Sequence, residues 1–305
     1  MNTAKSVLLK SGFTENDFIE QKSCAVVSGD VRNELSKLPE DIFQCCVTSP
    51  PYWGLRDYEA VNQIGAEEEL DDYIDNLVNV FREVRRVLKN DGIFWLNIGD
   101  SYTSGNRTWR GADKKNVARA MSYRPPTPEG LKPKDLIGVP WRLAFALQAD
   151  GWYLRSDVIW HKPNCQPESV KDRPTRSHEY LFLFSKSEKY YYDYEAIKEP
   201  AVLKNGKTKN KRTVWFPDAS ESIWNINTEP FIGAHFAVFP RALVRPCILS
   251  GSKPDSLVLD PFFGSGTTGE VCLETGRQCI GIELKPDYVE IAKHRLSIEQ
   301  RLPLF

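Results

Sequence analysis

The chain has 305 residues, of which 41% are hydrophobic and 27% charged, an ordinary composition for a soluble globular protein with one large core or two modest ones. No apolar run approaches the roughly eighteen residues that span a bilayer, and the N-terminus lacks the basic-then-apolar pattern of a secretory signal. We therefore expect a cytoplasmic protein without membrane contact. The seven cysteines are odd in number and include no Cys-x-x-Cys pair, so we expect buried, reduced thiols and no metal site.

Charge is distributed unevenly along the chain, although the formal net charge is only -1. Acidic residues gather between positions 59 and 75, and basic residues gather at 107–134 and again at 204–212. The low net charge argues against a nucleic-acid partner, but local basic blocks can still contact phosphates. A solvated loop remains the commoner explanation for any single block.

The N-terminal half predicts strands that alternate with helices. "CAVVSGD" (24–30), "FQCCVTS" (43–49) and "GIFWLNIGD" (92–100) read as buried strands. Between the last two, apolar residues recur at helical spacing from Leu70 to Leu88, and we expect this helix to end at Asp91-Gly92. This alternation predicts an α/β domain with a largely parallel sheet.

The C-terminal half continues the alternation around polar, irregular stretches. We expect helices at 139–151, at 239–251 and from Pro286 onward, and strands at 152–163, 179–187, 256–260 and 278–284. The irregular stretches, at about 101–135 and 186–230, look like insertions into the domain.

A glycine-rich turn follows the strand at 256–260. The segment "LDPFFGSGTTGE" places Gly264, Gly266 and Gly269 before a helix, and Glu283 ends the next strand about 20 residues later. Glycines let the backbone approach a ligand, the helix N-terminus presents free N–H groups, and the carboxylate can accept both hydroxyls of a ribose. Asp30 can reach an adenine amino group from its own strand end. These features fit a nicotinamide cofactor and S-adenosylmethionine equally well.

The segment "TSPPYWGLRDY" (48–58) stiffens the chain with two prolines directly after a strand. Followed by "DPFFGSGTTG", it resembles the β-class amino-methyltransferases of DNA, which use S-adenosylmethionine to methylate cytosine N4 or adenine N6. Their catalytic motif is (Asp/Asn/Ser)-Pro-Pro-(Tyr/Phe/Trp), and the β order puts it ahead of the cofactor motif. The resemblance covers nearly the whole chain, since further family motifs fall at 28–30, 96–102, 176–186 and 235–240.

The resemblance implies the Rossmann-like class I methyltransferase fold, an α/β architecture. We expect a circularly permuted, mostly parallel seven-stranded sheet with helices on both faces and with the chain ends close together. Residues 1–305 would form one catalytic domain, whose insertions at about 101–135 and 186–230 make a target-recognition region. The cofactor-binding residues implied by the family are Asp30, Phe236, Asp260, Pro261, Phe262, Phe263, Gly264, Ser265, Gly266, Thr267 and Glu283.

The motif Ser49-Pro50-Pro51-Tyr52 supplies the expected catalytic residues. An exocyclic amino nitrogen shares its lone pair with the ring, so it is a poor nucleophile. The Ser49 hydroxyl and the Pro50 carbonyl, held in direction by the proline pair, can accept its two N–H groups and aim the lone pair at a sulfonium methyl. Tyr52 offers a flat face to a base swung out of the duplex, and we expect Trp53 to pack beneath it. Serine at position 49, where adenine enzymes more often carry Asp, favours cytosine N4, with adenine N6 as the alternative.

Double-stranded DNA is the expected partner, and the two basic stretches would neutralise its phosphates and read guanine edges. The candidate DNA-binding residues are Arg107, Arg110, Arg124, Lys209 and Arg212. A cognate restriction endonuclease is a further candidate partner, and we expect the enzyme to be a monomer or a homodimer.

Other functions account for parts of the sequence. A nicotinamide-dependent oxidoreductase would use the glycine turn but leave the proline pair unexplained. RNA and protein methyltransferases with a similar motif typically begin it with Asn and carry the cofactor motif first. A metal-dependent nuclease could use Asp255, Glu283 and Lys285, although ribose binding explains Glu283 better. Asp100 could bond near the catalytic turn or simply satisfy a strand end.

Overall fold

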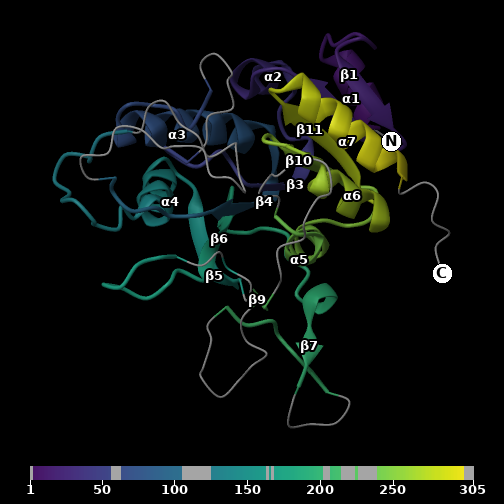
Figure 1. Cartoon of the computed structure of the whole chain (residues 1–305). Helices are drawn as coiled ribbons and strands as arrows, with labels where there is room; N and C mark the ends of the chain where they lie inside the picture. The colour runs from purple at the N-terminus through teal and green to yellow at the C-terminus, as the bar shows by residue number, and fades with distance from the viewer. Residues whose placement is uncertain are drawn as a thin grey trace.

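A mixed sheet runs through the middle of the computed structural model, between two layers of helices (Figure 1). The structure describes residues 3–55, 63–104, 125–162, 165, 168–201, 207–213, 224–225 and 239–298. Within that part of the chain, no helix combines the length and the apolar character needed to cross a membrane.

The strand order is β1-β2-β11-β10-β3-β4-β6-β5-β9. Its seven central strands, in that order, are Cys24–Ser28, Gln278–Glu283, Leu257–Asp260, Phe43–Thr48, Leu88–Ile98, His178–Ser185 and Tyr153–His161. β6 is antiparallel to both of its neighbours, and the other central strands run parallel. This is the mostly parallel sheet that the sequence predicted. Two short edge strands, β1 (Phe18–Gln21) and β9 (Trp224–Asn225), extend it beyond the expected seven.

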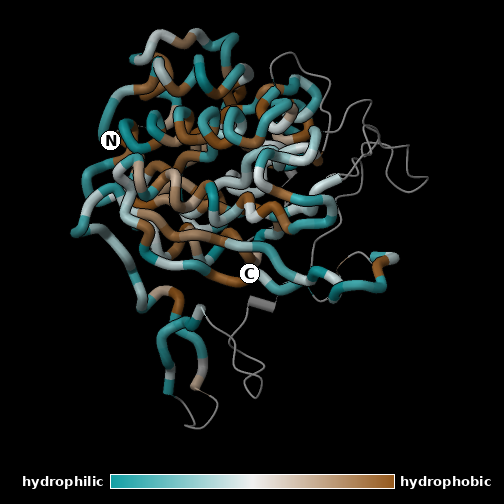
Figure 2. The backbone as a smooth tube through the Cα atoms, turned by 90° about the vertical axis from the view of Figure 1, so that its left-hand side faces the viewer, coloured by the Kyte–Doolittle hydropathy of each residue, from teal (hydrophilic) through white to brown (hydrophobic). Residues whose placement is uncertain are grey.

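Helices cover both faces of the sheet, as expected. One face carries α1 (Ala4–Lys10), α2 (Val31–Lys37), α3 (Leu70–Val87) and α4 (Val139–Ala149), and the other carries α5 (Arg241–Gly251), α6 (Thr267–Glu274) and α7 (Pro286–Ile298). Cys46 of β3 packs toward the first layer, whereas its neighbours Cys45 and Val47 pack toward the second. This alternation is the period of a strand buried on both faces. Figure 2 shows the hydrophobic stretches gathered in the interior and hydrophilic turns around them.

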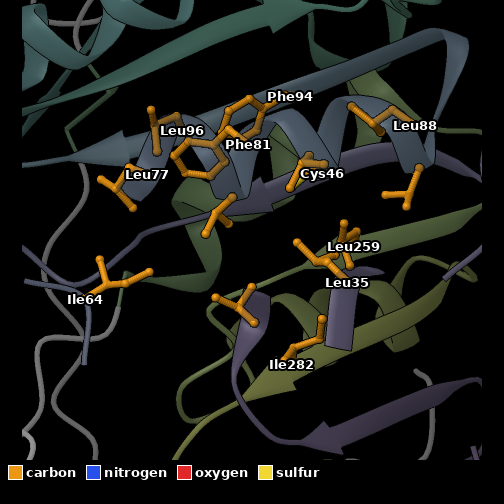
Figure 3. Packing of buried hydrophobic residues seen from close by; sticks show 14 of the residues in the cluster. Leu35, Cys46, Ile64, Leu77, Phe81, Leu88, Phe94, Leu96, Leu259 and Ile282 are labelled. Atoms are coloured by element: carbon orange, nitrogen blue, oxygen red, sulfur yellow. The ribbon is translucent and has the colours of Figure 1, made fainter. Parts of the chain in front are cut away.

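The first layer is locked by aromatic packing between α3 and the sheet (Figure 3). The rings of Phe81 and Phe94 lie 4.7 Å apart between centroids, and both side chains are fully buried beside Leu77. Burying each such side chain contributes about 1.5–3 kcal/mol, so this contact is a substantial part of the force that holds α3 on the sheet.

The boundary between α3 and β4 differs from the prediction. Asp91-Gly92 does not end the helix, because α3 already ends at Val87 and Leu88 pairs with Phe43 of β3. The register between β3 and β4 shifts after this pair, and Asp91 in the bulge accepts a hydrogen bond from the Gln44 side chain at 3.0 Å. Strand pairing over a buried Leu88 therefore overrides the local turn signal.

The first residues after β6, from 186 onward, stay bonded to the body of the domain. Tyr191 N donates to Asp91 O at 2.9 Å, and Asp193 N donates to Ser250 O at 2.8 Å. After the short helix η2 (Glu195–Ile197), the strands β7 (Glu199–Pro200) and β8 (Thr208–Lys209) form a hairpin that extends away from the body (Figures 1 and 2).

The two ends of the described chain meet at one edge of the sheet. β2 pairs in parallel with β11, and α7 packs against β1 and β2 (Figure 1). The N-terminal strands therefore complete the half of the sheet that the C-terminal strands begin, as the permuted order predicted.

Candidate active site

A cavity of about 240 Å³ opens at the carboxyl ends of the parallel strands. Its walls come from the turns that follow β2, β3, β10 and β11, together with residues of β4, β5 and β6. The order in which strands are added reverses between the parallel neighbours β10 and β3, because β10 leads through α6 to β11 on one side, and β3 leads through α3 to β4 on the other. Open α/β sheets bind their ligands at such switch points.

The glycine turn forms one wall of the cavity. Gly264 and Gly266 have φ angles of 53° and 88°, in the left-handed region, and Gly266 caps the N-terminus of α6. The Glu283 carboxylate accepts from Gly264 N and from Lys285 N, both at 2.8 Å. Burial raises the pKa of Glu283. The turn and the strand tip therefore hold one another in a fixed geometry.

Asp260 lies behind this wall and does not line the cavity. Its carboxylate is fully buried and accepts from the hydroxyls of Thr48 and Thr268, each at 2.6 Å, and from Phe262 N at 3.1 Å. Burial raises its pKa to about 6. These bonds tie the end of β3 to the start of α6, so the geometry points to a positioning role rather than to contact with a ligand.

Asp30 lines the cavity at the end of β2 and caps α2 by accepting from Arg32 N at 2.9 Å. The Arg32 guanidinium also contacts the carboxylate, with Nη2 2.5 Å from Oδ2. This guanidinium lowers the pKa of Asp30. Asp30 therefore lines the cavity as a carboxylate paired with Arg32, which lines it as well.

The motif Ser49-Pro50-Pro51-Tyr52 lines the cavity directly after β3. The Tyr73 hydroxyl of α3 donates to the Pro51 carbonyl at 2.8 Å and so fixes the orientation of the turn. Trp53 is buried, and its indole N–H donates to Glu67 O at 2.9 Å, so this ring packs under the turn as expected.

A chain of polar side chains continues from the motif to the opposite wall. Ser49 Oγ lies 3.4 Å from the Tyr52 hydroxyl, which donates to Glu179 Oε2 at 2.8 Å. Asn97 Nδ2 also donates to that oxygen, at 3.3 Å, while Lys162 Nζ forms an ion pair with Glu179 Oε1. Burial first, and then the charge of Glu179, raise the pKa of Tyr52.

The Tyr52 ring is held as firmly as its hydroxyl. A Cβ atom added at Gly99 would lie 2.6 Å from Tyr52 Cε2, so only glycine at this position allows the ring its place. The face of Tyr52 therefore has one orientation relative to the motif.

The cavity unites most of the residues that the sequence singled out. It is lined by Asp30, Ser49, Pro50, Pro51, Tyr52, Pro261, Phe262, Phe263, Gly264, Ser265, Thr267 and Glu283. Gly266 lies behind the lining with Asp260. Lys209 and Arg212 belong to the β7–β8 hairpin region instead, and Lys209 Nζ is 3.7 Å from Glu199 Oε1. Phe236, Arg107, Arg110 and Arg124 lie outside the described residues.

Several cavity residues were not named in the sequence analysis, among them Asn97, Trp160, Lys162, Glu179 and Tyr288, whereas Phe239 lies in the segment 235–240 that matched a family motif. Asn97 and Glu179 fall inside the segments 96–102 and 176–186 that matched family motifs, which was the available signal. Lys162 follows a strand rich in aromatic residues and carried no signal of its own.

Two alternatives from the sequence fail on geometry. Asp255 precedes β10 and pairs with Gly276, whereas Glu283 lies at the far end of the neighbouring parallel strand, so they cannot share a metal ion. Asp100 accepts from the backbone of Gly138 and Val139 at 2.9 and 3.1 Å, and it therefore satisfies the start of α4 rather than the catalytic turn.

The sheet, its two helical layers and the cavity at the switch point have the arrangement of the class I methyltransferase fold. The solved structure of PvuII DNA methyltransferase (cytosine-N4-specific) superposes with a TM-score of 0.63 at 22% identity and covers 90% of both chains. A putative DNA modification methylase from Thermus thermophilus, solved with S-adenosyl-L-methionine, gives a TM-score of 0.58 at 24% identity and covers 90% of this chain and 95% of that one.

Sequence relatives narrow the class to a family. The family model described as DNA methylase matches residues 43–294. The type II methyltransferase M.SmaI of Serratia marcescens is 66% identical over 275 residues, 90% of this chain and 91% of that protein. M.Cfr9I of Citrobacter freundii, also a type II methyltransferase, is 59% identical over 281 residues, 92% of this chain and 90% of that one. The chain belongs to the DNA methylase family of N6 and N4 amino-methyltransferases.

The family confirms the resemblance and the fold that the sequence predicted. It also confirms the cofactor, because S-adenosylmethionine is the methyl donor of these enzymes, and the nicotinamide alternative is wrong. The chain is a type II DNA methyltransferase of a restriction-modification system.

Proposed function

We propose that this enzyme methylates the exocyclic N4 of cytosine at specific sites in double-stranded DNA. The observation that carries the proposal is the shared cavity: Ser49 of the catalytic motif and Glu283 beside the glycine turn line the same space. A methyl donor held by one wall therefore faces an amino group held by the other.

The residues of the first wall suit S-adenosylmethionine. Glu283 offers carboxylate oxygens to ribose hydroxyls, Asp30 offers an acceptor to the adenine amino group, and the turn at Gly264 leaves room for close backbone approach. Asp260 supports the turn from behind through Thr268 and Phe262. Bound there, S-adenosylmethionine supplies an electrophilic methyl group.

The residues of the second wall prepare the nucleophile. Ser49 Oγ and the Pro50 carbonyl accept the two N–H groups of the target amine, which draws its lone pair away from the ring. The hydrogen bond from the Tyr73 hydroxyl to the Pro51 carbonyl fixes the turn, so that both acceptors keep their position at the cavity. The fixed ring of Tyr52 provides the face against which a flipped base can stack.

Serine at the first motif position supports cytosine over adenine. Adenine enzymes of this family more often carry a carboxylate there, and the structural relative from PvuII, which is cytosine-N4-specific, shares the fold. Adenine N6 is the alternative, because both bases present the same kind of amino group.

DNA recognition would fall to segments outside the cavity. The β7–β8 hairpin carries Lys209 and extends away from the sheet, with Arg212 following it (Figure 1). We assign it, with the segment around 101–135, to a target-recognition region within a single domain of residues 1–305. The type II relatives further support a cognate endonuclease with the same site, and the enzyme would act as a monomer or a homodimer.

The test is to express the chain, digest host DNA to nucleosides and identify the modified species by mass spectrometry. N4-methylcytosine is expected, and it should be absent from cells that express Ser49→Ala. N6-methyladenine instead would reassign the target base. Neither base, from a protein that binds S-adenosylhomocysteine, would overturn DNA amino-methylation altogether.

A further inference from the structure

The polar chain that starts at Ser49 ends on a charged pair in the opposite wall. Tyr52 lies between Ser49 and Glu179, at 3.4 Å from the former and 2.8 Å from the latter. The side chains of Glu179 and Lys162 are only 16% and 19% exposed, and both line the cavity. Among the described residues, the side chains that donate to Glu179 are Tyr52, Asn97 and Lys162.

The proposed reaction leaves a proton to be removed, and this inference rests on that reaction. As the new N–C bond forms, the amino nitrogen gives up its lone pair and becomes strongly acidic. One of its N–H bonds must break. The Pro50 carbonyl can accept a hydrogen bond but cannot keep a proton, and a serine hydroxyl that receives a proton must give up its own.

Serine differs here from the carboxylate that many family members carry at the same position. A carboxylate can hold the proton, whereas the alkyloxonium form of a serine is too acidic to persist at neutral pH. An enzyme with Ser49 therefore needs a second acceptor within reach, and the only side chain bonded to Ser49 Oγ among the described residues is Tyr52.

We propose that Glu179 receives the proton that leaves the target amine, through Ser49 and the hydroxyl of Tyr52. The amine N–H breaks toward Ser49 Oγ, the Ser49 proton passes to Tyr52 Oη, and the Tyr52 proton passes to Glu179 Oε2. The methyl–sulfur bond breaks with its electron pair staying on sulfur. Charge is conserved, because the carboxylate is neutralised as the sulfonium loses its charge.

Neighbouring groups prepare each member of this relay. The raised pKa of Tyr52 keeps it a neutral phenol, which can accept one proton and donate another at the same time. Lys162 and Asn97 orient the Glu179 carboxylate, and Lys162 Nζ itself lies 4.2 Å from the Trp160 ring centroid. The 3.4 Å gap between Ser49 and Tyr52 is of the kind that closes when a substrate binds.

Other titratable groups near Glu179 are few among the described residues. His178 precedes it on β6, with a pKa lowered by burial and by Arg176 and raised by Glu179, while His161 and Asp100 also act on that histidine from β5 and from the end of β4. The described contacts of Tyr52 include none of these four groups. Glu179→Gln removes a charge that acts on His178, so Tyr52→Phe, which leaves that charge in place, is the variant that separates the relay from the histidine.

The decisive variant is Glu179→Gln, which keeps an oxygen for the Tyr52 hydroxyl but cannot take a proton at neutral pH. The single-turnover methylation rate should fall about 10²-fold, a typical contribution of general base catalysis. The acid limb of the wild-type pH–rate profile should disappear with the carboxylate. Tyr52→Phe, which keeps the ring but breaks the relay, should show the same fall and the same flat limb.

A readout independent of turnover comes from the phenol. Because the charge of Glu179 helps raise the pKa of Tyr52, Glu179→Gln should lower that pKa in an ultraviolet difference titration. Subtracting the Tyr52→Phe spectrum isolates the Tyr52 signal from the other tyrosines. Affinity for S-adenosylhomocysteine, measured by calorimetry, should be unchanged in both variants and shows that they are folded.

Glu290→Gln is the matched control. Glu290 pairs with Lys293 on the exposed side of α7, and the same chemical change there should leave the rate, the pH profile and the phenol titration as in the wild type. The relay is overturned if Glu179→Gln keeps the wild-type rate and acid limb, or if it lowers the rate equally at every pH and leaves that limb in place. The relay can be tested on whichever base the wild type methylates, so failure of the cytosine assignment alone leaves it standing.

Discussion

The two walls of the cavity are built by different kinds of bond. On the wall that we propose to hold the cofactor (the cofactor wall), the Glu283 carboxylate bonds to the backbone N–H groups of Gly264 and Lys285, which lie within 19 positions of it. On the wall that we propose to hold the target base (the catalytic wall), Tyr52 and Glu179 bond side chain to side chain across 127 positions of sequence. The first wall is a local motif, while the second exists only after the sheet has formed.

This difference separates binding from chemistry. Because backbone donors cannot be removed by changing a side chain, the cofactor wall is tested most directly at the acidic side chain of Glu283. Each member of the catalytic wall is replaceable, so its contribution to the reaction can be removed one group at a time.

The largest effect should come from Ser49→Ala on the catalytic wall. Removing the hydroxyl takes away one of two acceptors for the target amine, and the single-turnover rate should fall about 10²- to 10³-fold. Binding of S-adenosylhomocysteine, measured by calorimetry, should not change, since Ser49 belongs to the other wall. A parallel loss of cofactor affinity would show that the two walls are not separate.

Asp260→Asn tests the support behind the cofactor wall. The pKa of Asp260 rises from 3.8 to about 6 on folding, so its stabilising contribution is complete below the lower value and is lost as the pH rises through the higher one. The uncharged variant escapes this loss. We compare the free energy of unfolding of the variant with that of the wild type at about pH 4 and at about pH 7. The difference between the two proteins should move in favour of the variant by roughly 2–3 kcal/mol from the lower pH to the higher one. Denaturant titrations at both pH values measure this difference. If the free energy of unfolding changes with pH in the same way in both proteins, the raised pKa of Asp260 is contradicted.

Glu283→Ala tests the cofactor wall itself. If Glu283 accepts the ribose hydroxyls as proposed, loss of its carboxylate should weaken S-adenosylhomocysteine binding by about 1.5–3 kcal/mol, or roughly 10- to 150-fold. Glu290→Ala on the exposed side of α7 is the control and should bind normally. Equal affinities for the Glu283 variant and the wild type would remove Glu283 from the site.

The smallest effect should come from Thr48→Val, at the point where the walls are joined. This isosteric change deletes one of three donors to Asp260 and should lower the free energy of unfolding by about 1 kcal/mol in urea titrations. The methylation rate should stay near that of the wild type. A large loss of rate at full stability would mean that the bond aligns the two walls rather than merely stabilising them.

The same contrast explains what could be predicted from sequence. The strands, the glycine turn and the Ser49 motif were all recognisable, because hydrophobic period, turn residues and motif order are local properties. Glu283 was placed correctly in the cavity for the same reason, since it lies one strand after the turn.

The omissions and the misplaced end of α3 involve distant partners. The sequence also could not show that the Asp260 carboxylate lies outside the cavity lining and accepts a hydrogen bond from Thr48, which lies 212 positions earlier. Glu179 and Lys162 lie side by side because β5 and β6 pair in antiparallel fashion. The periodicity of the sequence does not predict the register of that pairing. The end of α3 was misjudged because pairing of Leu88 with Phe43 outweighs a nearby Asp-Gly.

The cysteines have a practical consequence for following this enzyme at work. Six of the seven are buried, whereas Cys165 is partly exposed. The pKa of each buried thiol is raised, at Cys24 by a hydrogen bond with Cys279 and then by burial, and at the others by burial first. The backbone N–H of Cys165 donates to Lys162 O at 3.2 Å, beside the proposed relay. A maleimide dye would therefore attach at one place, three residues after Lys162, without any cysteine being removed, and its fluorescence could be followed as DNA is added.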